Sequence, residues 1–292
     1  MDTNMNILVP IDFREQSLNA LNIAIGLAKT LKLKISLLYV HQDKGALTSL
    51  FSSEQTALFD EAVLEKLQDL AKINAEKNNV VIDSKLVHHN SVHTAILDYA
   101  DKNSTEIIVM GRGQKDNDVV IGANTLRILR SSNVPVITVD QNYDLSKIRN
   151  ILLPLDLSKE TRQKVNWAIT LAKLFDADIK VISALWSPNN ENIVNQLNAQ
   201  LIQVDNFIKK EGVTCTVDVI NSTDDAKTFV PIILKYVESE GDIDLILIMT
   251  QQETGFIEFF IGTHASELIR KSTTPVMSII PHETGQINWG LF

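Results

Sequence analysis

Two stretches of the sequence decide the fold: Ile7-Leu8-Val9-Pro10-Ile11-Asp12 and Ile151-Leu152-Leu153-Pro154-Leu155-Asp156. Each is an apolar run that ends in Pro-x-Asp, and a short apolar run bounded by a turn residue is typical of a fully buried strand. The match continues at the same offset of 144 into the helical segments that follow, at residues 22–29 and 166–173. Self-similarity at a fixed offset predicts that the chain is a duplicated domain.

The later part of each copy also repeats, at an offset of 140. There Ile121-Gly122 matches Ile261-Gly262, and Pro135-Val136 matches Pro275-Val276. The same features therefore follow one another in the same order in both halves. The predicted organisation is a first domain at residues 1–140, a polar linker at 141–148, a second domain at 149–282 and an apolar tail at 283–292.

Length and composition agree with two domains. A chain of 292 residues, of which 45% are hydrophobic and 22% charged, is typical of a globular protein with two domains of ordinary size. Each half is long enough to bury its own core. The apolar tail is expected to pack on its own domain or on a partner subunit.

Apolar runs alternate with helical patterns in both halves. Strands separated by helices require crossover connections and a parallel sheet that is covered on both faces. The predicted fold class is therefore α/β, with two tandem, doubly wound, five-stranded parallel-sheet domains of Rossmann-like type. The expected strands lie near residues 6–11, 35–40, 80–87, 106–110 and 134–139, and near 151–155, 179–184, 215–220, 245–249 and 276–280.

Charge and cysteine content exclude several classes of protein. The net charge is −9, and an acidic chain without a basic stripe argues against nucleic acid as a partner. No apolar run approaches the ~18 residues that a membrane span needs. The first residues lack the basic flank and apolar core of a signal peptide. The single cysteine, Cys215, is expected to be structural and fits a reducing compartment, so the sequence predicts a cytoplasmic protein.

The repeated residues resemble those of a tandem universal stress protein. The resemblance rests on Pro-x-Asp after the first strand, an Ala-rich helix, a fourth strand that ends in Met, a Gly-containing loop and an x-Pro-Val fifth strand. The stretch Phe259-Phe260-Ile261-Gly262-Thr263 is especially close. The resemblance extends over residues 6–139 and 150–280. It implies a non-enzymatic role in stress response, exercised by binding and signalling.

ATP-binding members of that family carry Gly-x-x-Gly, nine further residues, and then Gly-Ser or Gly-Thr. The glycines let backbone amides approach the phosphates, and the helix that follows adds free N–H groups and a favourable dipole. The resemblance places nucleotide contacts of the first domain at Asp12, Val40, Gly111, Arg112, Gly113, Gly122, Ala123 and Asn124, and those of the second at Asp156, Gly262 and Thr263.

Both copies depart from that motif. In the first, Gly111 and Gly122 are 11 residues apart instead of 13, and Ala123 replaces the hydroxyl. In the second, Thr250 stands at the first glycine position, and Glu253 puts negative charge where phosphates would lie. The motifs are therefore interpreted as degraded. One alternative is an ATP-binding switch that uses the first domain. Another is a nucleotide-hydrolysing or nucleotidyl-transferring enzyme, for which no catalytic or metal-ligand signature is present.

Simpler interpretations stay open for some of these residues. Asp12 and Asp156 could each cap the helix that follows, as Gly262-Thr263 could. Three nearby histidines, His88, His89 and His93, could ligate zinc, but adjacent strand residues point to opposite faces, which favours a polar loop entering a helix.

The fifth strand of each half, at residues 134–139 and 276–280, is an expected sheet edge. In the family that edge pairs domains, so the resemblance implies intramolecular pairing of the two domains through these strands. The candidate partners are therefore an adenine nucleotide and a second copy of the chain.

Overall fold

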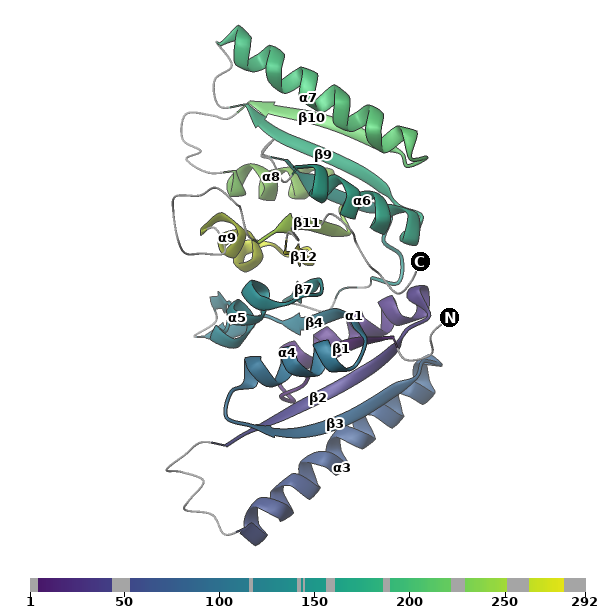
Figure 1. Cartoon of the computed structure of the whole chain (residues 1–292), viewed down its shortest axis with the longest axis vertical. Coiled ribbons are helices and arrows are strands. Elements are labelled where there is room, and N and C mark those ends of the chain that lie inside the picture. The colour runs from purple at the N-terminus through teal and green to yellow at the C-terminus, as the bar shows by residue number, and fades with distance from the viewer. Residues whose placement is uncertain are drawn as a thin grey trace. The chain divides into compact units, whose positions relative to one another are not determined.

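The computed structural model describes residues 5–43, 53–115, 118–140, 143, 145–155, 161–185, 190–221, 229–250 and 263–280 (Figure 1), and at 114–115, 118–120, 161–162 and 263–264 it describes the backbone only. The chain divides into two compact units, the first built from Met1–Ser146 and the second from Lys147–Ile287. The predicted apolar tail lies outside the described residues, as do linker residues 141, 142 and 144.

The first unit is a parallel five-stranded sheet with helices on both faces. Its strand order is β7-β4-β1-β2-β3, so the chain runs outward from β1 in one direction, returns, and runs outward in the other. Crossovers that run in opposite directions place α1 and α3 on one face and α4 and α5 on the other. The elements are β1 (Asn6–Pro10), α1 (Glu15–Leu31), β2 (Lys34–Gln42), α3 (Ser53–Asn78), β3 (Ile82–His89), α4 (Val92–Lys102), β4 (Thr105–Gly111), β5 (Gly113–Lys115), β6 (Asp118–Val120), α5 (Ala123–Ser131) and β7 (Val136–Val139).

The second unit repeats this topology. Its strand order, read from the fifth strand inward, is β12-β11-β8-β9-β10, which corresponds strand for strand to the first unit. The predicted fold class is therefore confirmed in each unit. The elements are β8 (Asn150–Pro154), α6 (Thr161–Phe175), β9 (Asp178–Leu185), α7 (Glu191–Lys210), β10 (Cys215–Asn221), α8 (Val230–Glu240), β11 (Leu245–Met249), α9 (Thr263–Lys271) and β12 (Val276–Ile279).

The central strands carry the core of each unit. Ile7, Leu8 and Val9 of β1 are fully buried, and every residue of β11 is buried as well. A strand covered by helices on both faces has no solvent-facing side, so its sequence reads as a continuous apolar run instead of an alternating one. This is the physical origin of the two apolar stretches from which the fold is predicted. Of the helices in the described ranges, none is long and apolar enough to cross a membrane.

The duplication extends to individual backbone hydrogen bonds. Corresponding positions of the two units make the same bonds after the first strand, before the fifth strand and after the fourth strand. In the first bond both atoms are offset by 144, and in the other two the donors are offset by 138 and the acceptors by 140. The matched pairs are Ile11 N to Leu38 O (2.9 Å) with Leu155 N to Ile182 O (2.8 Å), Ile108 N to Pro135 O with Ile246 N to Pro275 O (both 3.0 Å), and Arg112 N to Val139 O (2.7 Å) with Thr250 N to Ile279 O (3.0 Å).

The segment after β4 contains a pair of antiparallel strands that was not expected from the sequence. In this hairpin β5 pairs with β6, with Gly113 opposite Val120 and Lys115 opposite Asp118. The adjacent valines at 119 and 120 favour extended backbone, but two three-residue strands are too short to show a period. The hairpin occupies most of the segment between Gly111 and Gly122, which the family motif would use as a phosphate loop.

Cys215 is expected to be unreactive in the folded protein. It lies at the start of β10 and is 5% exposed, and burial together with the nearby Asp205 raises the pKa of its thiol to about 12. Because the thiolate is the reactive form, a shift of this size lowers the reactive fraction at neutral pH by roughly a thousandfold. A thiol-disulfide reagent should label the native protein far more slowly than the urea-unfolded protein. Equal rates would show that the thiol is accessible and ordinary.

Candidate functional site

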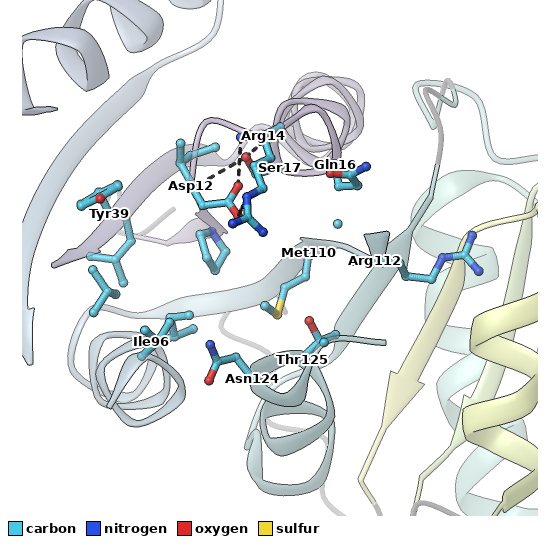
Figure 2. Close-up of a pocket in the computed structure, with 18 of the residues that line it drawn as sticks. Asp12, Arg14, Gln16, Ser17, Tyr39, Ile96, Met110, Arg112, Asn124 and Thr125 are labelled. Carbon is cyan, nitrogen blue, oxygen red and sulfur yellow. Dashed lines mark hydrogen bonds and ion pairs between the residues drawn. The ribbon is translucent and has the colours of Figure 1, made fainter. Parts of the chain in front are cut away.

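A cavity of about 550 Å³ opens at the carboxyl ends of the central strands of the first unit (Figure 2). Its walls come from the ends of β1, β2 and β4, from the first turn of α1, from α4 and from the first turn of α5. In this sheet β1 lies between β2 and β4, and the chain leaves β1 in one direction and reaches β4 from the other. The cavity therefore lies at the topological switch point, where doubly wound sheets bind ligands.

All the first-domain residues predicted to contact a nucleotide line this cavity. They come from four separate stretches of the chain, at the ends of β1, β2 and β4 and at the start of α5, that the fold brings together. In the second domain, Asp156 and Gly262 lie outside the described residues, and Thr263 is the first residue of α9. The first-domain residues at the cavity are Asp12, Val40, Gly111, Arg112, Gly113, Gly122, Ala123 and Asn124.

Asp12 closes the turn between β1 and α1. The backbone N–H of Arg14 donates to Asp12 Oδ1 at 3.0 Å, and Arg14 Nε lies 3.7 Å from Asp12 Oδ2. The first helical residue is Glu15, and its N-cap is Arg14, which makes no side-chain capping bond. Asp12 therefore supports an Asx-type turn and does not cap the helix itself. Its carboxylate remains 58% exposed and is available to a ligand in the cavity.

Phe13 holds this turn in a strained conformation. Its φ is +62°, in the left-handed region, which costs a non-glycine residue roughly 1–2 kcal/mol. Two contacts hold it there: the Tyr39 ring, with centroids 5.8 Å apart, and the Lys66 ammonium, 4.5 Å from the Phe13 ring centroid. Backbone strain that the surrounding structure maintains is common at ligand sites.

Tyr39 forms part of the cavity wall beside Asp12 (Figure 2). Burial raises the pKa of its phenol, and the charges of Asp12 and Asp60 raise it further. The side chain therefore stays neutral and presents both an aromatic face and a hydroxyl. Tyr39 is not among the residues predicted from the sequence, although its position next to Val40 at the end of β2 is a signal for it.

The first turn of α5 provides the anion-binding end of the cavity. Gly122 is the N-cap of this nine-residue helix and has no side chain to accept bonds from the first helical N–H groups. Its φ of −60° is open to any residue, and an added Cβ would meet only Thr125 Oγ1, at 3.8 Å. Neither the backbone nor the packing requires glycine here. Because Gly122 has no side chain, the N-terminus of α5 is open to the cavity. The helix dipole favours binding of an anion there.

Arg112 does not supply its charge to the cavity. Figure 2 shows its side chain pointing away from Asp12 and Asn124, and the residue is fully buried. Its Nη2 lies 3.9 Å from Asp140 Oδ2. Burial lowers the pKa of the guanidinium, and the charge of Asp140 opposes that shift. Of Arg112, which the family resemblance places among the nucleotide contacts, only the backbone is therefore directed to contribute to the cavity.

The three neighbouring histidines do not form one site. Ser91 N donates to His89 Nδ1 at 2.9 Å, and Ser91 Oγ lies 2.8 Å from His93 Nδ1, so these two rings belong to the polar entry into α4. His88 lies on the other face of β3 and makes different contacts, with Asp43 and Asp60. The predicted divergence of adjacent strand residues is what separates them.

Two solved structures of nearly the same length share this fold. A universal stress protein from Archaeoglobus fulgidus DSM 4304 is 18% identical, with a TM-score of 0.74 over 95% of this chain and 97% of that chain. A protein of unknown function from Pseudomonas aeruginosa PAO1 is 18% identical, with a TM-score of 0.64 over 94% of this chain and 92% of that chain. A shorter structure, a universal stress protein from Archaeoglobus fulgidus in complex with dAMP, is 19% identical over 44% of this chain and 96% of that chain, with a TM-score of 0.37.

The sequence itself matches a family model twice. In a comparison of this sequence with curated proteins, no significant match is found. The model of the universal stress protein family matches residues 3–140 and again residues 147–279, which together make up almost the whole chain. The chain belongs to the universal stress protein family and carries two copies of its domain.

Proposed function

We propose that this protein acts in stress response as a non-catalytic binding protein whose first domain holds an adenine nucleotide. The observation that carries the proposal is the cavity itself. It combines an open helix N-terminus at Gly122 with an exposed carboxylate at Asp12 and an aromatic wall at Tyr39. Its volume of about 550 Å³ is in the range of small-molecule sites.

The two ends of the cavity suit the two ends of a nucleotide. The first turn of α5 offers N–H groups and a positive dipole end to a phosphate. The carboxylate of Asp12 is able to accept bonds from ribose hydroxyls or from an amino group, and Val40 and Ile96 provide apolar surface for a base. A nucleotide therefore satisfies the polar groups at both ends while its base covers the apolar wall.

The composition of the cavity supports binding without turnover. Among the described residues that line it, none is His, Cys, Lys or Glu. The hydroxyl of Ser17 donates to the carbonyl of Arg14 at 2.9 Å and accepts from the N–H of Asp12 at 3.4 Å, so it is engaged in the turn. An activated nucleophile needs an adjacent base, and the lining residues do not provide that pair.

The hairpin limits how many phosphates the site favours. Because residues 113–115 pair with residues 118–120 as β5 and β6, these residues are committed to their own ladder instead of wrapping a phosphate chain. The Arg112 side chain is directed elsewhere as well. We therefore expect the first phosphate, at the α5 N-terminus, to supply most of the phosphate binding energy, and AMP to bind at least as tightly as ATP.

The proposal is tested by identifying and titrating the ligand. Mass spectrometry of small molecules released from the purified protein, followed by calorimetric titration with AMP, ADP and ATP, each with and without magnesium, should give one site per chain. Guanosine nucleotides are the matched controls. The proposal fails if no adenine nucleotide binds, and its non-catalytic part fails if phosphate is released from ATP faster than with a heat-inactivated sample.

Two sequence-based expectations belong to the same proposal. The single cysteine suits a reducing compartment, so we propose that the protein acts in the cytoplasm. We also propose that the two domains pair through their fifth strands, because an unpaired apolar sheet edge invites aggregation.

A further inference from the structure

A second group of chemically active side chains lies on the face of the first unit that α3 covers. The parallel register of β2 and β3 places His41 directly beside His88. Register partners on neighbouring strands project to the same face of a sheet. On that face α3 packs against both strands (Figure 1), and its second turn supplies Asp60. The sheet register and the helix docking thus bring together three residues that are far apart in the sequence.

The three side chains meet at their polar atoms. Asp60 Oδ1 lies 2.5 Å from His41 Nδ1, and Asp60 Oδ2 lies 2.9 Å from His88 Nε2. The two imidazole rings are stacked, with centroids 4.7 Å apart and planes 26° apart, so both edges face the same carboxylate. One nitrogen from each ring and one carboxylate oxygen lie within 4.8 Å of one another.

A fourth residue orients one of these rings. Asp43 Oδ1 lies 3.3 Å from Nδ1 of His88, on the side of the ring opposite to the nitrogen that meets Asp60. A carboxylate that accepts the proton of one ring nitrogen leaves the other nitrogen with a lone pair for a metal ion. Asp43 is therefore placed as a positioning residue, outside the group of direct ligands.

We propose that His41, Asp60 and His88 form a binding site for a divalent transition-metal ion, with Zn²⁺ as the first candidate. This site is separate from the nucleotide cavity, whose lining residues it does not share. Two imidazole nitrogens and one carboxylate oxygen are donors that Zn²⁺ accepts at about 2.0–2.2 Å. A bound ion would take the place of the protons in the hydrogen bonds between Asp60 and the two rings, because metal binding displaces protons from its ligands.

The donor set also decides against other common ions. Mg²⁺ and Ca²⁺ take oxygen ligands almost exclusively, so two imidazoles disfavour them. His41 and Asp60 are 16% and 20% exposed at their side chains, whereas His88 is 42% exposed. The ion would thus have two mostly buried ligands and one at the surface. Its fourth position would be open to water, as in zinc sites with three protein ligands.

The test measures zinc bound to the full-length, tag-free protein. After removal of metal with a chelator, titration with Zn²⁺ should show one tight site per chain in the wild type. His88→Gln and Asp60→Asn should each weaken this site at least tenfold. His89→Gln is the matched control, because its ring is one residue away on the opposite face of β3 and contacts Ser91 instead. Co²⁺ should give the visible absorption of a low-symmetry site in the wild type and lose it in His88→Gln.

Two results would overturn the proposal. The wild type could take up no zinc at concentrations that saturate ordinary protein sites, in which case the cluster is a hydrogen-bonded contact that docks α3. Alternatively, His88→Gln could retain the wild-type zinc affinity, which would place the ion elsewhere. Because His88 is partly exposed, the variant is expected to fold, and circular dichroism checks this. Nucleotide titration of the same variant should be unchanged, which separates this proposal from the function proposed for the cavity.

Discussion

Replacing Gly111 with alanine is expected to lower the free energy of unfolding of the first unit by about 3 kcal/mol. An added Cβ would lie 2.3 Å from the carbonyl oxygen of Gln16 and 2.4 Å from its carbonyl carbon. These are backbone atoms in the first turn of α1, so they cannot rotate away as a side chain would. Relief of the clash requires α1 to move off the end of β4. Ten residues of α1 are buried, against two of α3 on the same face, and Leu21, Ile23 and Leu27 are among them.

This loss is measured by urea unfolding. The transition is monitored by circular dichroism and by the fluorescence of a probe attached to the first unit. The control is Gly122→Ala, eleven residues along the chain in the same segment, where the new Cβ has room. That control should lose at most about 1 kcal/mol, because alanine is a poorer N-cap than glycine but its Cβ meets no close neighbour here. A Gly111→Ala protein as stable as the wild type would mean that the close approach of β4 and α1 is not required for folding.

Replacing Gly122 with valine is expected to reduce nucleotide affinity at least tenfold while the fold is retained. Gly111→Ala, in contrast, is expected to affect mainly stability. Glycine at this N-cap leaves the first N–H groups of α5 open to the cavity, and a branched side chain would fill that space. A tenfold loss corresponds to about 1.4 kcal/mol of binding free energy, less than one charge-assisted phosphate contact contributes. The N-cap substitution itself should cost the fold at most about 1 kcal/mol, because extended backbone at φ −60° accepts valine.

Calorimetric titration with AMP, paired with a melting curve, measures both effects in one sample. Gly122→Ala should lie between the wild type and Gly122→Val in affinity, because its smaller side chain fills less of the space before the helix. The expectation is contradicted if Gly122→Val binds AMP as the wild type does, since the phosphate would then lie away from α5. It is equally contradicted if affinity and stability fall together by the same amount in both variants.

The two glycines show why a motif is an incomplete description of a site. The family pattern treats Gly111 and Gly122 as parts of one phosphate loop. In the structure Gly111 is needed for the packing of a helix against a strand, whereas Gly122 keeps a helix terminus accessible. Between them, the hairpin of β5 and β6 replaces the loop that the motif describes. Sequence spacing alone could not separate these roles, because packing partners such as Gln16 come from elsewhere in the chain.

The positions of the strands could be predicted closely because burial on both faces forces nearly continuous apolar runs. The predicted strand at residues 245–249 has the same bounds as β11, and that at 6–11 extends one residue beyond β1. The third strand is shifted, from 80–87 to Ile82–His89, because its alternating and partly polar residues do not mark its ends. The short strands β5 and β6 escape prediction, since three residues are too few to show a hydrophobic period.

By itself, the sequence determined the duplication, the α/β class and the switch-point residues of the first domain. Local patterns predict these features: apolar runs, repeated offsets and the residues that follow each strand. Only the tertiary structure decided which side chains meet. In the tertiary structure the Arg112 side chain points away from the cavity, and Asp12 accepts a hydrogen bond within its turn. His41 lies against His88 and Asp60. The physical reason is that strand register and helix docking set these contacts, and both depend on packing between segments that are distant in the sequence.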